Sequence, residues 1–154
     1  MTAPDTYDVV HEGSCLCGAV RFTLRGEPLH FNVCHCTMCQ KFHGAMAGPY
    51  LRYSAADFTF VEGEEFEQEY VSSDWARRTF CRQCGSSLRY QYTPQPELTF
   101  IAAGVLDTEL AQGPTQHIFV KDKCSWYAIL DGRPQLRSWR DESHPEAGSG
   151  DGGS

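Results

Sequence analysis

Two pairs of cysteines have the type and spacing of metal ligands. The segment Cys81–Gly85 has two residues between its cysteines and a glycine directly after the second one. The segment Cys15–Gly18 repeats this arrangement with one residue between its cysteines. Thiolates at such spacing hold one metal ion in a tight turn, and the glycine permits the positive φ that the turn needs. Two pairs complete a tetrahedral set of sulfurs, so we expect a structural zinc site, and its ligands are Cys15, Cys17, Cys81 and Cys84.

A third group of cysteines, Cys34, Cys36 and Cys39, offers three thiolates within six residues. Three protein ligands with an open fourth position are typical of a catalytic zinc ion, whereas four ligands are typical of a structural one. Two histidines could close the site. We expect His35 to point away because it lies between two ligands, whereas His43 follows Cys39 by about one helical turn and could reach the metal. The spacing therefore predicts either an open catalytic site or a closed site of three cysteines and one histidine.

Three sulfurs on a zinc ion limit the chemistry of an open site. Three thiolates and one Zn²⁺ ion have a net charge of about −1, and electron-rich sulfurs weaken the ability of zinc to generate hydroxide. The same ion is a good site for a further soft ligand, and a thiol bound there would be held as a thiolate. These residues therefore favour a small thiol as substrate over the hydrolysis of peptides or phosphates.

The composition of the chain agrees with a metalloprotein of the cytoplasm. A length of 154 residues allows one domain, and 13 basic against 20 acidic side chains give a net charge of −7, which disfavours nucleic-acid binding. We expect neither a membrane span nor secretion, because the sequence has no run of about 18 apolar residues and no signal segment. In a reducing cytosol, clustered cysteines bind metal more often than they form disulfides. Cys124 has no partner nearby, and we expect it to be a small buried residue.

The elements that must position these groups are mostly short strands. Alternating apolar and polar residues predict a mainly β fold. The expected strands are 20–25, 29–33, 58–61, 66–71, 88–92, 98–102 and 118–120. The strands at 58–61 and 66–71 flank acidic residues and predict a hairpin, whose acidic run we interpret as a solvated edge. That run contains Glu62, Glu64, Glu65, Glu67 and Glu69.

One short helix is predicted at 38–43. Thr37 can cap its N-terminus, Gln40 stands at the spacing of a capping box, and Gly44 suits the position after the last turn. The helix carries Cys39 in its first turn, where the helix dipole favours a thiolate. We expect a single domain over residues 1–142, followed by a disordered tail at 143–154 that is rich in glycine, serine and acidic residues.

The three cysteine segments, in this order, resemble those of the glutathione-dependent formaldehyde-activating enzyme and centromere-protein-V family, abbreviated GFA. The matching segments are Gly13–Phe22, Cys34–Gly44 and Phe80–Leu88. The later segments His117–Val120 and Trp126–Gly132 are similar to the closing part of that family. The resemblance covers roughly residues 10–140.

The resemblance implies a β-tent-like fold of several small coiled antiparallel sheets with one short helix and two zinc ions. It implies that the first and last cysteine pairs hold a structural zinc ion and that the middle triplet holds a catalytic one. The namesake activity joins formaldehyde to glutathione to give S-hydroxymethylglutathione, which is carbon–sulfur lyase chemistry. This chain is shorter than the namesake enzyme and the family is broad, so the resemblance leaves the electrophile open.

The sequence leaves the substrate contacts and two other functions open. Lys41 could bind a carboxylate of glutathione or be a solvated helix residue, and Arg77 and Arg78 could clamp a carboxylate or form the exposed side of a strand. His117 could carry protons or be a structural histidine. The alternatives to an enzyme are a non-catalytic protein-binding module with two structural zinc ions and a redox sensor whose zinc thiolates are oxidised.

Overall fold

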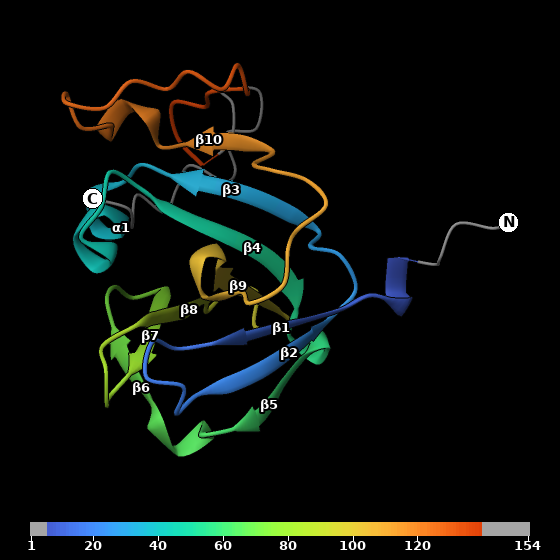
Figure 1. The fold of residues 1–154 in the computed structure, drawn as a ribbon. Helices are drawn as coiled ribbons and strands as arrows, with labels where there is room; N and C mark the ends of the chain where they lie inside the picture. Colours follow the sequence, from blue (N-terminus) through green and yellow to red (C-terminus); the bar gives the residue numbers. More distant parts are fainter. Residues whose placement is uncertain (1–5, 140–154) are drawn as a thin grey trace, which may run out of the picture. The chain divides into compact units, whose positions relative to one another are not determined.

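A computed structural model describes residues 6–139, and the tail expected at 143–154 lies outside them. These residues form ten strands in two sheets, one α-helix and five short 3₁₀ turns, so the expected mainly β fold is confirmed (Figure 1). The described chain divides into two compact units, the first formed by 6–30 and 51–112 and the second by 31–50 and 113–139. The expectation of one domain over 1–142 stays a prediction.

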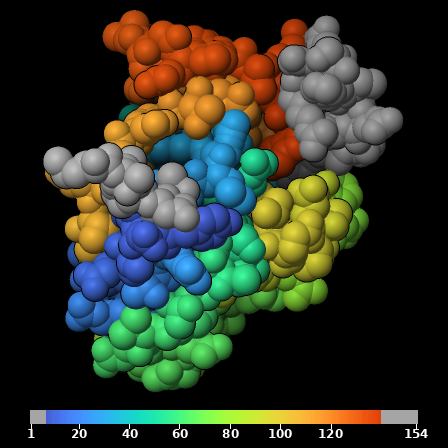
Figure 2. All heavy atoms as spheres, turned by 90° about the vertical axis from the view of Figure 1, so that its right-hand side faces the viewer, coloured from blue at the N-terminus to red at the C-terminus, as the bar shows by residue number. Residues whose placement is uncertain are grey.

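The first unit contains an antiparallel sheet in the order β1-β2-β5. Its strands are β1 (Val10–Ser14), β2 (Arg21–Arg25) and β5 (Phe58–Glu62). Phe22 and Leu24 of β2 are buried, as the alternation predicts, and the Phe22 ring stacks on Phe58 with 5.0 Å between ring centroids. In Figure 2 the blue atoms of β1 and β2 lie against the green atoms of β5.

The same unit contains four antiparallel strands in the order β9-β8-β7-β6. They are β6 (Glu67–Val71), β7 (Ala76–Cys81), β8 (Ser87–Tyr92) and β9 (Leu98–Ala102). Tyr90 of β8 faces Phe100 of β9, and their rings stack with a centroid distance of 4.4 Å. The 3₁₀ turns of this unit are Thr6–Asp8, Ala55–Asp57, Glu64–Phe66 and Ala103–Val105.

The predicted hairpin between 58–61 and 66–71 is wrong. Both strands exist, but β5 pairs with β2 whereas β6 pairs with β7. Gly63 lies between them at φ 79°, and a Cβ atom there would lie 1.8 Å from the carbonyl oxygen of Ala19. The chain therefore leaves one sheet for the next at a point where only glycine fits.

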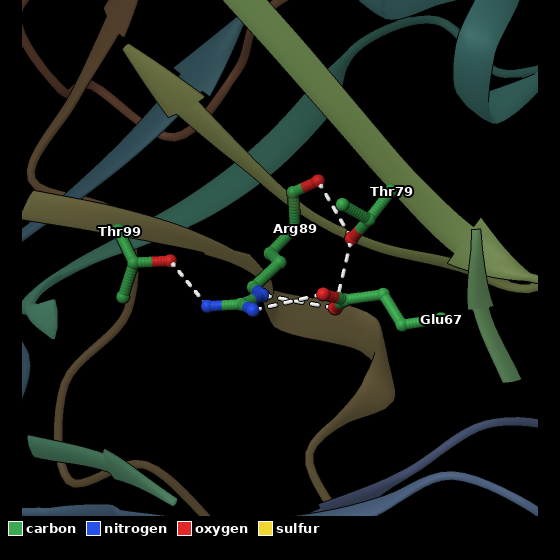
Figure 3. A network of polar contacts seen from close by, with 4 residues as sticks. All are labelled: Glu67, Thr79, Arg89 and Thr99. Carbon is green, nitrogen blue, oxygen red and sulfur yellow. Dashed lines mark hydrogen bonds and ion pairs between the residues drawn. The ribbon is translucent and has the colours of Figure 1, made fainter. Parts of the chain in front are cut away.

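Glu67 does not belong to a solvated edge, which corrects the interpretation of the acidic run. Its carboxylate forms a two-pronged ion pair with Arg89 at 2.8 and 2.9 Å, and the two side chains are only 15% and 12% exposed (Figure 3). Thr79 donates to the same carboxylate at 3.1 Å, and Arg89 also donates to Thr99 at 3.3 Å. The guanidinium lies 4.1 Å from the centroid of Phe58, so this network joins the two sheets of the first unit.

The second unit is built around a parallel strand pair, a departure from the antiparallel sheets expected. β10 (Gln116–Ile118) pairs in parallel with β3 (His30–Cys34), and the start of β4 (Gly48–Ser54) is the other neighbour of β3 (Figure 1). The helix α1 (Thr37–His43) follows β3, and the 3₁₀ turn Val120–Asp122 follows β10. The strand predicted at 118–120 therefore begins and ends two residues earlier.

Candidate metal centres

Four cysteines of the first unit bring their sulfurs together. The Sγ atoms of Cys15, Cys17, Cys81 and Cys84 all lie within 4.8 Å of one another. The Sγ atom of Cys17 is 3.6 Å from that of Cys15 and 3.9 Å from that of Cys81. A tetrahedral zinc ion with bonds of about 2.3 Å requires sulfurs about 3.8 Å apart. The four cysteines therefore fit a zinc ion, as the spacing of the pairs predicts.

Two glycine turns shape this four-cysteine site. Gly18 and Gly85 adopt positive φ values of 78° and 81°, and their N–H groups donate to the carbonyls of Cys15 and Cys81 at 3.0 and 2.7 Å. The N–H of Val20 donates to Sγ of Cys15 at 3.2 Å, which holds this sulfur in place. Apolar neighbours cover one side of the group, because Val20 and Leu88 form one buried cluster with Cys15 and Cys81, whereas Cys17 is exposed. The site is thus part of the core of the first unit.

The three-cysteine group lies in the second unit. The Sγ atoms of Cys34, Cys36 and Cys39 also lie within 4.8 Å of one another, and all three residues are buried. Among residues 6–139, no histidine, aspartate or glutamate supplies a further atom to this group. The described chain therefore offers three ligands, which is the donor set of an open site.

Sulfur also caps the helix that carries Cys39. The N-cap residue is Cys36, whose Sγ accepts a hydrogen bond from the N–H of Cys39 at 3.3 Å, so the prediction of Thr37 as the cap is wrong. Gly44 ends the helix in the left-handed conformation at φ 61°, as predicted. Gln40 makes no capping box, because its Nε2 donates to the carbonyls of His35 at 2.7 Å and Asp122 at 3.0 Å. A sulfur acceptor at the N-cap fits an anionic ligand at the positive end of the helix dipole.

Neither histidine near the three-cysteine group belongs to it. The ring of His35 points to His117, with 2.8 Å between Nε2 and Nδ1, so the expectation that it points away is confirmed. His43 Nε2 lies 2.6 Å from the hydroxyl of Tyr50, and the two rings meet edge to face. Burial lowers the pKa of His35 to about 4, with further lowering by the charges of His117 and Lys123, so the ring is neutral at pH 7.

The pKa values of Cys34 and Cys84 are shifted in opposite directions in the two cysteine groups. Hydrogen bonds with Cys36 and Cys39, followed by burial, raise the pKa of Cys34 well above its usual value. Three sulfurs this close repel one another as anions, so a cation among them is what would allow all three to ionise. In the four-cysteine site burial raises the pKa of Cys84, but hydrogen bonds from the side chain and backbone of Ser86 outweigh it and lower the pKa to about 6.

The other residues that the sequence singled out are not members of either cysteine group. Lys41 is exposed in the last turn of α1. Arg77 forms an exposed ion pair with Glu69 at 2.9 Å, whereas Arg78 is buried and donates to Ser72. Cys124 is half-buried, which corrects the expectation of a buried residue, and it lies outside both groups. Within residues 6–139, no helix has the length and apolar character needed to cross a membrane.

Sequence reasoning missed one residue of the second unit. Asp131 accepts a hydrogen bond from Nε2 of His117 at 2.8 Å, and the two form the outer part of a chain that ends at His35. The only signal was its place inside Trp126–Gly132, one of the segments of the family resemblance.

Comparisons with known proteins point to one family for most of the chain. Residues 10–122 match the family described as "Glutathione-dependent formaldehyde-activating enzyme", GFA. A Halomonas elongata protein whose name provisionally assigns it to these enzymes is 34% identical over 146 residues, which cover 88% of this chain and 92% of the relative. A protein of Schizosaccharomyces pombe, named as an uncharacterized lyase, is 32% identical over 93 residues, covering 60% of this chain and 66% of its own.

The fold has a counterpart among solved structures. The crystal structure of a Rhodobacter sphaeroides protein, Northeast Structural Genomics target RhR83, matches 81% of this chain and 99% of its own, with a TM-score of 0.54 and 23% identity. That likeness concerns the fold alone. The family match spans most of the chain and includes all seven clustered cysteines, so the chain belongs to the glutathione-dependent formaldehyde-activating enzyme family, GFA.

Proposed function

We propose that this protein is a cytoplasmic, zinc-dependent carbon–sulfur lyase that acts on a small thiol, glutathione in the first place, and an aldehyde or the adduct of the two. The observation that carries the proposal is the buried group of three cysteine sulfurs to which the described residues add no fourth ligand. Membership of the GFA family supports the same chemistry. The proposal rests on a donor set that leaves one position for a substrate sulfur.

The two cysteine groups have different roles in this proposal. Cys15, Cys17, Cys81 and Cys84 hold a structural zinc ion, because four sulfurs complete a tetrahedral shell. Cys34, Cys36 and Cys39 hold the catalytic one. When bound there, zinc supplies a Lewis acid that lowers the pKa of a substrate thiol and accepts its sulfur.

In this proposal the protein contributes mainly by positioning the thiol and the aldehyde, and less by general acid–base catalysis. A bond forms between the thiol sulfur and the aldehyde carbon, the carbonyl π electrons move to oxygen, and the thiol proton ends on that oxygen. The product is a hemithioacetal, which is S-hydroxymethylglutathione when the reactants are glutathione and formaldehyde, and no oxidant is consumed. Thiols add to formaldehyde unaided, so we expect the protein to accelerate the step mainly by holding both reactants in line.

The charge of the second unit supports an anionic thiol. Over its described residues, 31–50 and 113–139, it has five basic and two acidic side chains, although the whole chain has a net charge of −7. The basic residues are Lys41, Lys121, Lys123, Arg133 and Arg137, and the acidic ones are Asp122 and Asp131. A positive surface raises the local concentration of an anion. Glutathione, with two carboxylates and one ammonium group, suits this unit better than a neutral or cationic thiol.

The test is the rate at which glutathione and formaldehyde exchange with their adduct, measured by NMR exchange spectroscopy with and without the zinc-loaded protein. We expect acceleration above the uncatalysed rate by the wild type and by Cys124→Ser, and none by Cys39→Ser, which loses one metal ion. The diethyl ester of glutathione, which lacks both carboxylates, should be accelerated less. A wild type that binds two zinc ions and leaves the exchange rate unchanged, for formaldehyde and for a panel of other aldehydes, would contradict the proposal and favour a non-catalytic module.

A further inference from the structure

Three polar side chains of the second unit form a continuous chain of hydrogen bonds that ends between two of the clustered cysteines. Nε2 of His35 lies 2.8 Å from Nδ1 of His117, and Nε2 of His117 lies 2.8 Å from Oδ2 of Asp131. Both rings are buried, whereas the carboxylate is 40% exposed. The chain therefore leads from a surface carboxylate to the residue that separates Cys34 from Cys36.

The chemistry of the three groups sets the order of protons along this chain. The N–H of Arg133 donates to Oδ1 of Asp131 at 3.0 Å and, with His117, lowers the pKa of Asp131, which is a carboxylate at neutral pH. A carboxylate only accepts, so Nε2 of His117 carries a proton that it donates. Nδ1 of a neutral His117 is then an acceptor, and Nε2 of His35 donates to it. Each member thus fixes the tautomer of the next one.

Both backbone polar groups of His35 are hydrogen-bonded, as its ring is. Its N–H donates to the carbonyl of Ile118 at 2.9 Å, and its carbonyl accepts from Gln40 at 2.7 Å. The ring of Tyr127 stacks on the ring of His35 at a centroid distance of 6.3 Å. In the parallel pair, His117 stands opposite Val33 and Ile118 stands opposite Cys34. Side chains alternate along a strand, so His35 shares a face with Val33 and His117 whereas Cys34 points to the other face.

We propose that His117 and Asp131 are positioning residues of the three-cysteine metal site. They hold the His35 ring, and this ring anchors the peptide that carries two of the three sulfurs, Cys34 and Cys36. Residues that hydrogen-bond directly to a metal ligand commonly change metal affinity 10–100-fold when they are replaced. His117 and Asp131 act one step further out, through His35, so we expect an effect at the lower end of that range. The inference rests on the proposed function, because it assumes a metal ion at these cysteines. It adds to that function two residues, His117 and Asp131, that do not bind the metal and that affect only the three-cysteine site.

The test uses the full chain loaded with ¹¹³Cd²⁺, whose NMR shift distinguishes a four-sulfur site from a three-sulfur one. EDTA is then added in steps, and the two resonances report the affinity of each site separately. For Asp131→Asn we expect the three-sulfur resonance to disappear at about tenfold less EDTA than in the wild type, with the four-sulfur resonance unchanged. Asp131→Glu, which keeps the carboxylate, should restore part of the difference. Histidine ¹⁵N shifts should show the Nε2-protonated form of His117 in the wild type and a loss of that preference in Asp131→Asn.

His11 provides the matched control. It is a buried histidine of the first unit that contacts Glu27 at 3.3 Å and Thr108 at 2.8 Å. His11→Phe should lower stability and leave the three-sulfur resonance as resistant to EDTA as in the wild type, whereas His117→Phe should weaken it. Equal loss from both sites in Asp131→Asn, or no change in either, would overturn the inference while the proposed function stands. A wild type without any three-sulfur resonance would overturn both.

Discussion

The sulfur atoms of Cys17 and Cys81 lie 3.9 Å apart although 64 positions separate the two residues in the chain. Cys17 follows the first strand of one sheet, and Cys81 is the last residue of β7 in the other. A metal ion at the four-cysteine site would therefore fasten the two sheets of the first unit at one point. Cys15 and Cys81 are also buried among Val20 and Leu88, so the same point is part of the apolar core.

Removal of the metal from this site should unfold the first unit. Structural zinc contributes on the order of 10 kcal/mol in small domains, and without it four buried or crowded thiols lose their common partner. We expect Cys81→Ser to abolish the cooperative thermal transition followed by circular dichroism. Elemental analysis should find one zinc ion fewer per chain.

Cys124→Ser is the control for that experiment, because Cys124 is half-buried and outside both groups. It should keep both zinc ions and unfold within a few degrees of the wild type. If Cys81→Ser instead unfolded at the wild-type temperature with its zinc content intact, the four cysteines would not form a structural site.

The ion pair between Glu67 and Arg89 should contribute more to stability than its exposed neighbour (Figure 3). Arg89→Ala leaves the Glu67 carboxylate largely buried without its cation, which costs about 3–5 kcal/mol. We expect the double variant Glu67→Met with Arg89→Met to lose less, because both charges are then absent. Urea unfolding monitored by fluorescence measures the free energies.

The pair of Arg77 and Glu69 shares strand β6 with Glu67, but its side chains are 47% and 42% exposed. Solvent screens such a pair, so Arg77→Ala should cost under about 1 kcal/mol. Equal losses for Arg77→Ala and Arg89→Ala would show that burial does not decide the strength of these pairs.

Local patterns predicted the two cysteine pairs, the cysteine triplet and several strands because each depends on residues close in sequence. The spacing of two ligands in a turn and the period of two along a strand are read within a few residues, and β8 and β9 agree with the sequence to within one residue. Strand partners are a long-range property. The alternation in 58–61 and 66–71 marks two strands, but it has no information about their pairing with β2 and β7.

Two details of the candidate sites could not be predicted from local sequence patterns. Capping rules rank oxygen acceptors, so they select Thr37, whereas the structure uses the Cys36 sulfur, which is set by its position in the metal group. Asp131 comes 96 residues after His35 in the chain, and no local pattern links a surface aspartate to a buried histidine. Only the packing of β10 on β3 brings His117 between them.

Tyr53 should make the protein less stable at alkaline pH. Burial raises the pKa of its phenol well above the usual value, and the carboxylates of Glu27 and Asp57 raise it further. The folded chain therefore keeps a proton that the unfolded chain loses above about pH 10, so this contribution to stability is present below pH 10 and is lost as the pH rises further. The free energy of unfolding should fall by up to about 1.4 kcal/mol per pH unit from this group.

Tyr53→Phe separates this effect from the other tyrosines. The variant loses the hydrogen bond from the hydroxyl to the carbonyl of Gly26 at 3.0 Å, which costs about 1 kcal/mol at neutral pH. Its unfolding free energy, measured in urea between pH 8 and pH 11, should fall less steeply than that of the wild type above pH 10. Parallel curves for the two proteins would show that Tyr53 ionises normally.

Gly63 should be the least replaceable glycine between the two sheets of the first unit. Gly63→Ala meets two penalties, because φ is 79° and the new Cβ would lie 1.8 Å from the carbonyl oxygen of Ala19. Gly44→Ala meets only the first, since φ is 61° and no atom lies within 4 Å of its Cβ position. We expect a loss of about 1 kcal/mol for Gly44→Ala from backbone strain, and a loss several times larger for Gly63→Ala because backbone must move. Thermal unfolding of both variants measures the difference, and equal losses would mean that the close approach of Gly63 to Ala19 is not what fixes the passage from β5 to β6.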